Sequence, residues 1–176
     1  LAIIQCGIKE IREIKHGVHS GIIKIQTHAV RPNKDYVTKR HEKITFDNFI
    51  SNLVAEVNAD SIIADIQHME DYGTRKYNTS QAVEAQQWIK SQFENYGLEV
   101  ELTYGGVSGS ENVIAKQLGA VFPNKFVVVG GHYDSTSSSS DAPGADDNAS
   151  GTAAVMEIAR ILSEHQFNYT IIYCAW

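Results

Sequence analysis

Residues 126–176 read FVVVGGHYDSTSSSSDAPGADDNASGTAAVMEIARILSEHQFNYTIIYCAW, and this stretch decides the fold. It begins with a continuous apolar run, Phe126 to Val129, and ends with a second one, Tyr169 to Trp176. Unbroken runs of this kind are typical of strands covered on both faces. Between them, a polar loop leads into a helical pattern from about Ala149 to Ser163. A strand, a helix and a second strand in this order form a βαβ unit, so the sheet is at least partly parallel. The fold class that we predict is α/β, with a mostly parallel (mixed) central sheet flanked by helices.

Three helices are expected upstream of this unit. Apolar residues recur at three- and four-residue steps over 46–57 and again over 62–69, which predicts a helix in each segment. The break between the two segments contains Asn58, a residue type that caps helices. A third helix is expected to start at a Ser80 cap and to end at Gly97.

The segments between the third helix and the βαβ unit predict strands. Apolar and polar residues alternate over 98–103, the pattern of a half-buried strand, and another strand is expected from Glu111 onward. Pro123-Asn124-Lys125 is expected to form a turn. Residues 1–45 show no comparable pattern, and we expect a pro-segment or a separate preceding region there. Residues 46–176 are therefore expected to form the structured domain.

The composition limits the possible classes of function. The 176 residues carry a formal net charge of -6 with scattered lysines and arginines, which argues against nucleic acid as a partner. No apolar stretch approaches the length of a bilayer span, so no membrane contact is expected. Cys6 and Cys174 form no CxxC pair, which argues against a cysteine-rich zinc site. We expect small molecules or peptides as partners and a monomeric chain.

The loop between the first apolar run and the helix contains the candidate functional residues. His132 and Asp134 follow the strand end, and the pair Asp146-Asp147 precedes the helix, where open α/β sheets place their sites. An imidazole and a carboxylate suit Zn²⁺, and Asp134 could hydrogen-bond the imidazole nitrogen that faces away from the metal. A solvated surface loop explains the same residues, because aspartates also favour a helix start. The spacing does not match an EF-hand calcium loop. The residues alone leave both readings open.

Two segments of this loop, GHYDS at 131–135 and APGADDNASG at 142–151, together resemble the M28 family of co-catalytic zinc peptidases. The greatest likeness is to the secreted bacterial leucyl aminopeptidases. It extends upstream through Gly73-Thr74-Arg75. The resemblance implies an aminopeptidase that uses two zinc ions and releases N-terminal residues from peptides. It also implies that residues 46–176 are the N-terminal part of a catalytic domain, in a protein that is secreted or periplasmic.

The resemblance implies a role for each site residue. His132 resembles the histidine ligand of one zinc ion, and Asp134 resembles the aspartate that orients this histidine. Asp147 resembles the carboxylate that bridges both zinc ions. It is preferred to Asp146 because the bridging residue of the family is the second of the pair. The family has a cis peptide bond after the bridging aspartate, so Asp147–Asn148 is predicted to be cis.

The resemblance also implies functional groups that this chain does not contain. In the family, a glutamate pair follows the strand that ends here at Trp176, and an aspartate and a histidine come later. They supply the general base and the other zinc ligands, so we expect an inactive fragment. Glu157 and Glu164 are expected to be exposed helix residues, and His165 is expected at the helix end. The alternatives are an M28-like carboxypeptidase, a glutaminyl cyclase, or a non-enzymatic binding domain.

Overall fold

The computed structural model describes residues 48–104 and 111–176, so the expectation for residues 1–45 lies outside the described residues. The elements in chain order are α3 (Asn48–Ala55), α4 (Ala59–Glu70), α5 (Ser80–Asn95), β1 (Glu99–Thr103), β2 (Asn112–Gln117), β3 (Phe122–Gly131), η1 (Ala145–Ala149), α6 (Ser150–Ser163) and β4 (Tyr169–Ala175). Within these two ranges, no helix has both the length and the apolar character that a bilayer span requires.

The four described strands form one mixed sheet in the order β1-β2-β4-β3. The β3 and β4 strands pair in parallel, with Val129 opposite Tyr173, and α6 is the crossover between them. The predicted βαβ unit and the α/β class with a mixed sheet are therefore confirmed. The other two pairings, β1 with β2 and β2 with β4, are antiparallel. The expectation that the sheet is mostly parallel is wrong for the described strands, because only β3 and β4 are joined by a helical crossover, while β1 and β2 form an antiparallel pair whose β2 also runs opposite to β4.

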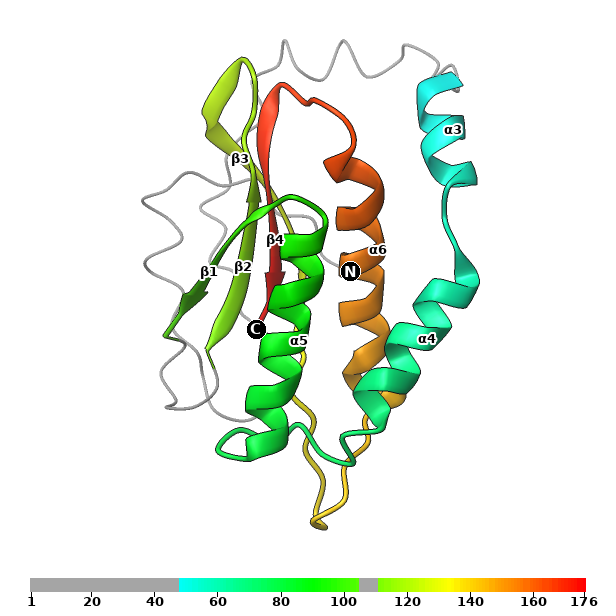
Figure 1. The fold of residues 1–176 in the computed structure, drawn as a ribbon, viewed down its shortest axis with the longest axis vertical. Coiled ribbons are helices and arrows are strands. Elements are labelled where there is room, and N and C mark those ends of the chain that lie inside the picture. Colours follow the sequence, from blue (N-terminus) through cyan, green and yellow to red (C-terminus); the bar gives the residue numbers. More distant parts are fainter. Residues whose placement is uncertain (1–47, 105–110) are drawn as a thin grey trace, which may run out of the picture.

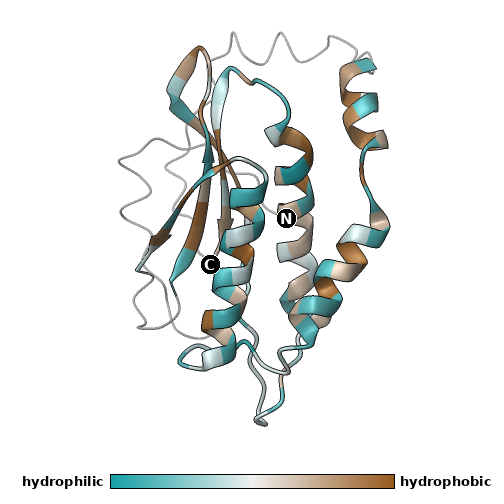
Figure 2. Ribbon diagram, viewed as in Figure 1, coloured by the Kyte–Doolittle hydropathy of each residue, from teal (hydrophilic) through white to brown (hydrophobic). Residues whose placement is uncertain are grey.

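A layer of helices covers one face of the sheet and buries the core. The α5 and α6 helices lie side by side against the strands, and α4 packs along α6 (Figure 1). Hydrophobic and hydrophilic residues alternate in bands along α4 and α5, as expected for amphipathic helices (Figure 2). The fully buried apolar side chains between helices and sheet include Ile89, Phe93, Val113, Val155, Met156 and Tyr173. Each buried side chain of this size contributes about 1.5–3 kcal/mol, which holds α5 and α6 against the sheet.

The predicted turn at 123–125 is wrong, because these residues lie inside β3. They form an irregularity in the strand, where the pairing register shifts between Phe122 and Phe126. Phe122 remains in the strand because its amide donates to the Asn168 carbonyl at 2.8 Å. Its ring also stacks on Tyr169, with the ring centroids 5.4 Å apart. Pairing on both sides of the irregularity therefore outweighs the turn tendency of the Pro-Asn-Lys sequence.

The helix caps agree with the sequence to within one residue. The side chain of Asn58 caps α4 as predicted and accepts a hydrogen bond from the Asp60 amide at 3.0 Å. The cap of α5 is Thr79, one residue before the predicted Ser80. The Thr79 hydroxyl accepts from the Ala82 amide at 3.2 Å, the geometry of an N-cap.

Candidate functional site

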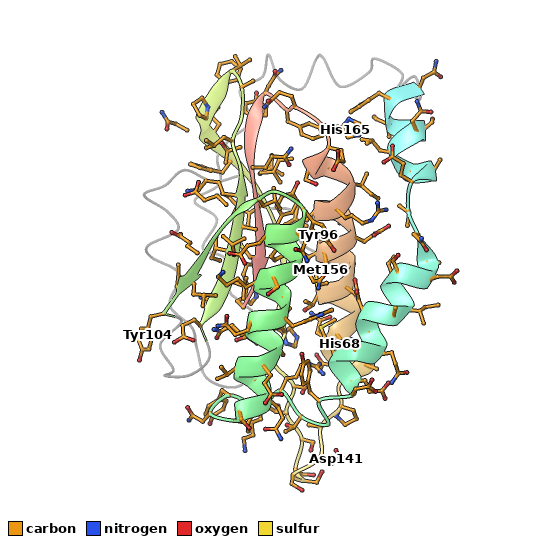
Figure 3. All side chains as sticks on the ribbon, in the orientation of Figure 1. His68, Tyr96, Tyr104, Asp141, Met156 and His165 are labelled. Carbon is orange, nitrogen blue, oxygen red and sulfur yellow. The ribbon has the colours of Figure 1, made fainter. Side chains whose placement is uncertain are left out.

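The candidate site lies at the carboxyl end of β3, where the chain leaves the sheet. Gly131 is the last residue of β3, and the Tyr133 amide still donates to the Trp176 carbonyl at 2.9 Å. The loop then extends to a tip near Asp141 and returns to η1 and α6 (Figure 3). This is the edge of an open α/β sheet where ligand sites occur.

The structure brings the three predicted site residues together. The His132 Nδ1 atom lies 3.0 Å from Asp134 Oδ1, and the His132 Nε2 atom lies 3.1 Å from Asp147 Oδ1. The imidazole therefore lies between two carboxylates, one at each ring nitrogen. The side chains of His132 and Asp134 are 43% and 38% exposed, whereas that of Asp147 is 89% exposed. The Asp147 carboxylate is thus open to solvent, and the Asp134 carboxylate is partly covered.

The donor atoms of His132 and Asp147 fit one zinc ion. A nitrogen and an oxygen that each bind zinc at ~2 Å with tetrahedral angles lie about 3.3 Å apart. The observed separation of 3.1 Å is close to this value. Among the described residues, no group of three or more histidine, cysteine or acidic side chains could hold a metal ion. Because catalytic zinc sites take three protein ligands, this pair fits part of a site.

The two carboxylates change the protonation of His132. The hydrogen bond from its ring to Asp134 raises the pKa of His132, and the negative charges of Asp134 and Asp147 act in the same direction, while burial opposes them. With Nδ1–H donated to Asp134, the Nε2 lone pair is free for a metal ion. A ligating imidazole must be neutral, so a metal ion and a proton compete for Nε2.

A sharp bend before α6 places Asp147. The Asp147–Asn148 peptide bond is cis, which confirms the prediction for this bond. Both residues have non-helical backbone angles, and Gly144 enters the bend with a φ of 56°. Added to Gly144, a Cβ would lie 2.6 Å from Ser135 Cβ and 2.7 Å from the Asp147 carbonyl oxygen. Only glycine therefore fits this position, for reasons of both conformation and space.

Hydrogen bonds connect this bend to the backbone of His132. The Asn148 side-chain amide donates to the His132 carbonyl at 3.3 Å and accepts from the Gly151 amide at 3.1 Å. The Thr152 hydroxyl donates to the same His132 carbonyl at 3.0 Å. The start of α6 and the end of β3 are thus joined directly. These bonds keep the residues on either side of the long loop close together.

The neighbouring Asp146 differs from Asp147 in its surroundings. Asp146 is exposed, and its backbone carbonyl accepts from the Ser150 hydroxyl at 2.8 Å. The carboxylate that meets His132 Nε2 is that of Asp147. The geometry thus favours Asp147 for a ligand shared with His132.

Arg75 belongs to this site, but the sequence assigned no role to it. Its side chain is fully buried, and Ser135 beside it is 3% exposed. The Arg75 backbone amide donates to the Ser135 hydroxyl at 2.9 Å. Burial lowers the pKa of Arg75, while the nearby charges of Asp134 and Glu70 oppose this shift. A buried arginine that binds backbone carbonyls leaves no periodic pattern in the sequence. The one sequence signal for Arg75 is its place in Gly73-Thr74-Arg75, which belongs to the family resemblance.

The expectation that Glu157 is exposed is wrong. Its side chain is 4% exposed and accepts from Arg160 Nε at 2.8 Å and from the Asn58 amide at 2.7 Å. It is buried because it joins the start of α4 to α6. Glu164 is exposed as expected and is the C-cap of α6, and His165 follows it, with its amide donating to the Leu162 carbonyl.

Known proteins with similar sequences are described as peptidases. Residues 112–176 match the model of peptidase family M28. A probable zinc metalloprotease of Pyrenophora teres f. teres is 37% identical over 72% of this chain and 32% of its own length. A probable leucine aminopeptidase of Arthroderma benhamiae is 26% identical over 94% of this chain and 51% of its own length. The chain thus spans between about a third and a half of these relatives.

Solved structures share the fold. LapB from Legionella pneumophila superposes with a TM-score of 0.65 at 23% identity, over 86% of this chain and 46% of that chain. A glutaminyl cyclase from Bacteroides thetaiotaomicron superposes with a TM-score of 0.55 at 23% identity, over 68% of this chain and 46% of that chain. The fold is therefore shared with a glutaminyl cyclase. The family model and the sequence relatives identify this chain as a member of peptidase family M28, of whose relatives it spans a part.

Proposed function

We propose that the protein is a zinc-dependent aminopeptidase that releases N-terminal residues from peptides. The observation that carries this proposal is the approach of His132 Nε2 to Asp147 Oδ1 at 3.1 Å, with Asp134 bonded to the opposite ring nitrogen. Relatives described as a zinc metalloprotease and as a leucine aminopeptidase support the same reaction class. We propose two zinc ions per complete site.

His132, Asp134 and Asp147 would have different roles in binding zinc. His132 would bind one zinc ion through Nε2, and Asp147 would bridge both ions. Asp134 would hold the Nδ1 proton, which fixes the ring orientation and makes Nε2 a better donor. Bound zinc supplies Lewis acidity, which activates water near neutral pH and polarises a carbonyl. The exposed Asp147 carboxylate leaves the site open to an incoming peptide.

We further propose that these 176 residues alone do not hydrolyse peptides. Among the described residues, no group of three or more histidine, cysteine or acidic side chains could hold a metal ion, and the chain spans about a third of a matched zinc metalloprotease. A general base and further ligands would come from sequence after Trp176. We also propose a monomer that is secreted or periplasmic. Fractionation of the native cells and the mass of the purified protein in solution test these two statements.

The test uses the polypeptide from the complete open reading frame. Leucine nitroanilide is expected to be hydrolysed, and its N-acetylated form is not, because an aminopeptidase requires a free amino group. His132→Ala and Asp147→Asn are expected to lose this activity. Asp146→Asn, the neighbouring matched control, is expected to keep most of it. A chelator is expected to abolish hydrolysis, and metal analysis is expected to find two zinc ions per chain.

Other outcomes would contradict the proposal. Cleavage only of N-blocked peptides from their C-terminus would make the protein a carboxypeptidase. Cyclisation of N-terminal glutamine with no hydrolysis would make it a glutaminyl cyclase. Zinc or peptide binding with no turnover of any substrate would favour a binding domain.

A further inference from the structure

A single buried arginine binds the backbone of three segments that surround the site. Arg75 Nε donates to the Tyr133 carbonyl at 2.7 Å, and Nη1 donates to the carbonyls of Met69 and Pro143, each at 2.6 Å. Nη2 donates to the Gly144 carbonyl at 3.0 Å. We call Arg75 with these four carbonyls the Arg75 cluster. The guanidinium is fully buried, and no carboxylate accepts any of these four bonds.

Backbone contacts reinforce the Arg75 cluster. The Ser135 hydroxyl accepts from the Arg75 amide and donates to the Ala142 carbonyl at 2.6 Å. The Ala142 amide in turn donates to the Gly73 carbonyl at 2.8 Å, and Thr74 pairs with Ala142 as an isolated bridge. The two arms of the loop are therefore fastened to the same short segment before α5.

The bonds of Arg75 fall beside the two candidate zinc ligands. Tyr133 separates His132 from Asp134, so its carbonyl belongs to the backbone that carries both side chains. The Gly144 carbonyl lies at the entry to the bend that carries Asp147, and it also accepts from the Ala149 amide at 3.0 Å. A shift of Arg75 would thus move both ends of the His132–Asp147 pair.

We propose that Arg75 is a positioning residue that sets the separation of His132 and Asp147 for zinc. The inference rests on the proposed function. The planar guanidinium has five donors in a fixed arrangement, so it holds carbonyls from different segments at fixed directions. A lysine has a compact ammonium group and cannot reproduce this arrangement. Arg75 therefore acts on zinc binding through the backbone and without touching the metal.

The experiment compares Arg75 with Arg160, a second arginine that stabilises the fold but lies away from the site. Arg160 also donates to a backbone carbonyl, that of Glu56 at 2.9 Å. It lies ten positions after Ser150, which begins α6, so it is about 15 Å along the helix from the site end. Arg160→Met is therefore a control for the loss of an arginine that stabilises the fold elsewhere.

Zinc affinity is measured by competition with a chromogenic chelator, well below the melting temperature, in the polypeptide from the complete open reading frame. Replacing groups that orient metal ligands typically weakens binding about 10–100-fold, and we expect losses in this range for Arg75→Lys and Arg75→Met. The absorption spectrum of the cobalt-substituted protein is expected to change as well. Arg160→Met is expected to lower the melting temperature but to keep zinc affinity and cobalt spectrum.

The outcomes separate this inference from the proposed function. Unchanged zinc affinity and cobalt spectrum in Arg75→Lys would overturn the inference, as would an equal loss of affinity in Arg160→Met. If both Arg75 variants fail to fold, Ser135→Ala tests the same connection, and an unchanged zinc affinity there would overturn it. If His132→Ala itself leaves zinc binding unchanged, the proposed function fails before the role of Arg75 is in question.

Discussion

Replacing Glu157 with alanine is expected to destabilise the protein by about 2–4 kcal/mol. The Glu157 carboxylate accepts three hydrogen bonds, two from Arg160 at 2.8 and 2.9 Å and one from the Asn58 amide at 2.7 Å. Hydrogen bonds to charged groups contribute about 1.5–3 kcal/mol each. The side chain of Arg160 is 38% exposed and regains water in the variant, which reduces the loss below that of a fully buried pair.

The loss is expected to depend on pH. The hydrogen bonds from Arg160 lower the pKa of Glu157, the Asn58 amide acts in the same direction, and burial opposes them. A carboxylate with a lowered pKa stabilises the folded state above its unfolded pKa of about 4.3, and this contribution is lost as the pH falls through the folded value. The difference between wild type and Glu157→Gln should therefore be largest near pH 7 and should shrink in acid.

Urea denaturation of wild type, Glu157→Ala, Arg160→Met and the double variant measures the effect. The two residues are in direct contact, so the double-mutant cycle should give a coupling energy of at least about 1 kcal/mol. Glu157→Gln is the matched control, because it keeps the shape and loses the charge. A loss below about 0.5 kcal/mol for Glu157→Ala, the size of an ordinary surface substitution, would refute the reasoning.

Three further predictions concern other parts of the fold. Burial first, and the charge of Glu157 second, raise the pKa of Asp65 to about 6. Its ionised form therefore costs stability, and Asp65→Asn should raise the melting temperature at pH 7.5 but not at pH 4; an equal gain at both values would contradict this. In Gly151→Ala, the new Cβ would lie 2.3 Å from Asn148 Oδ1, so chelator competition should show zinc binding weakened by about 10-fold or more. Met156 is fully buried, so Met156→Ala should cost about 2–5 kcal/mol in urea denaturation.

The local elements could be predicted because each depends on neighbouring residues. The apolar runs at Phe126 and Tyr169 and the helix between them produce the βαβ unit whatever surrounds them. The strand order could not be predicted, because β4 lies between β2 and β3 through contacts distant in sequence. The turn expected at Pro123 failed for the same reason, since its partners are in β4.

The approach of His132 to Asp147 came from family resemblance and not from pattern. A long loop separates the two residues, and their spacing alone does not bring them together. The burial of Glu157 could have been recognised, because Ala153 and Ile161, one turn away on each side, are both buried and place it on the inner face of α6. A glutamate on that face requires a partner, and Arg160 is within reach on the same helix.

The chemistry of the Arg75 cluster has a consequence for how substitutions are tolerated. The acceptors at Met69, Tyr133 and Pro143 are backbone carbonyls, a group that every amino acid has. The bonds themselves do not depend on the side chains at these positions, as long as the backbone keeps its path. The guanidinium is supplied by one side chain only. These bonds therefore place no demand on the side chains of the acceptors, whose own constraints come from the packing of Met69 and Tyr133 and from the backbone at Gly144. Natural variation should be almost absent at position 75, because no other side chain can replace the guanidinium.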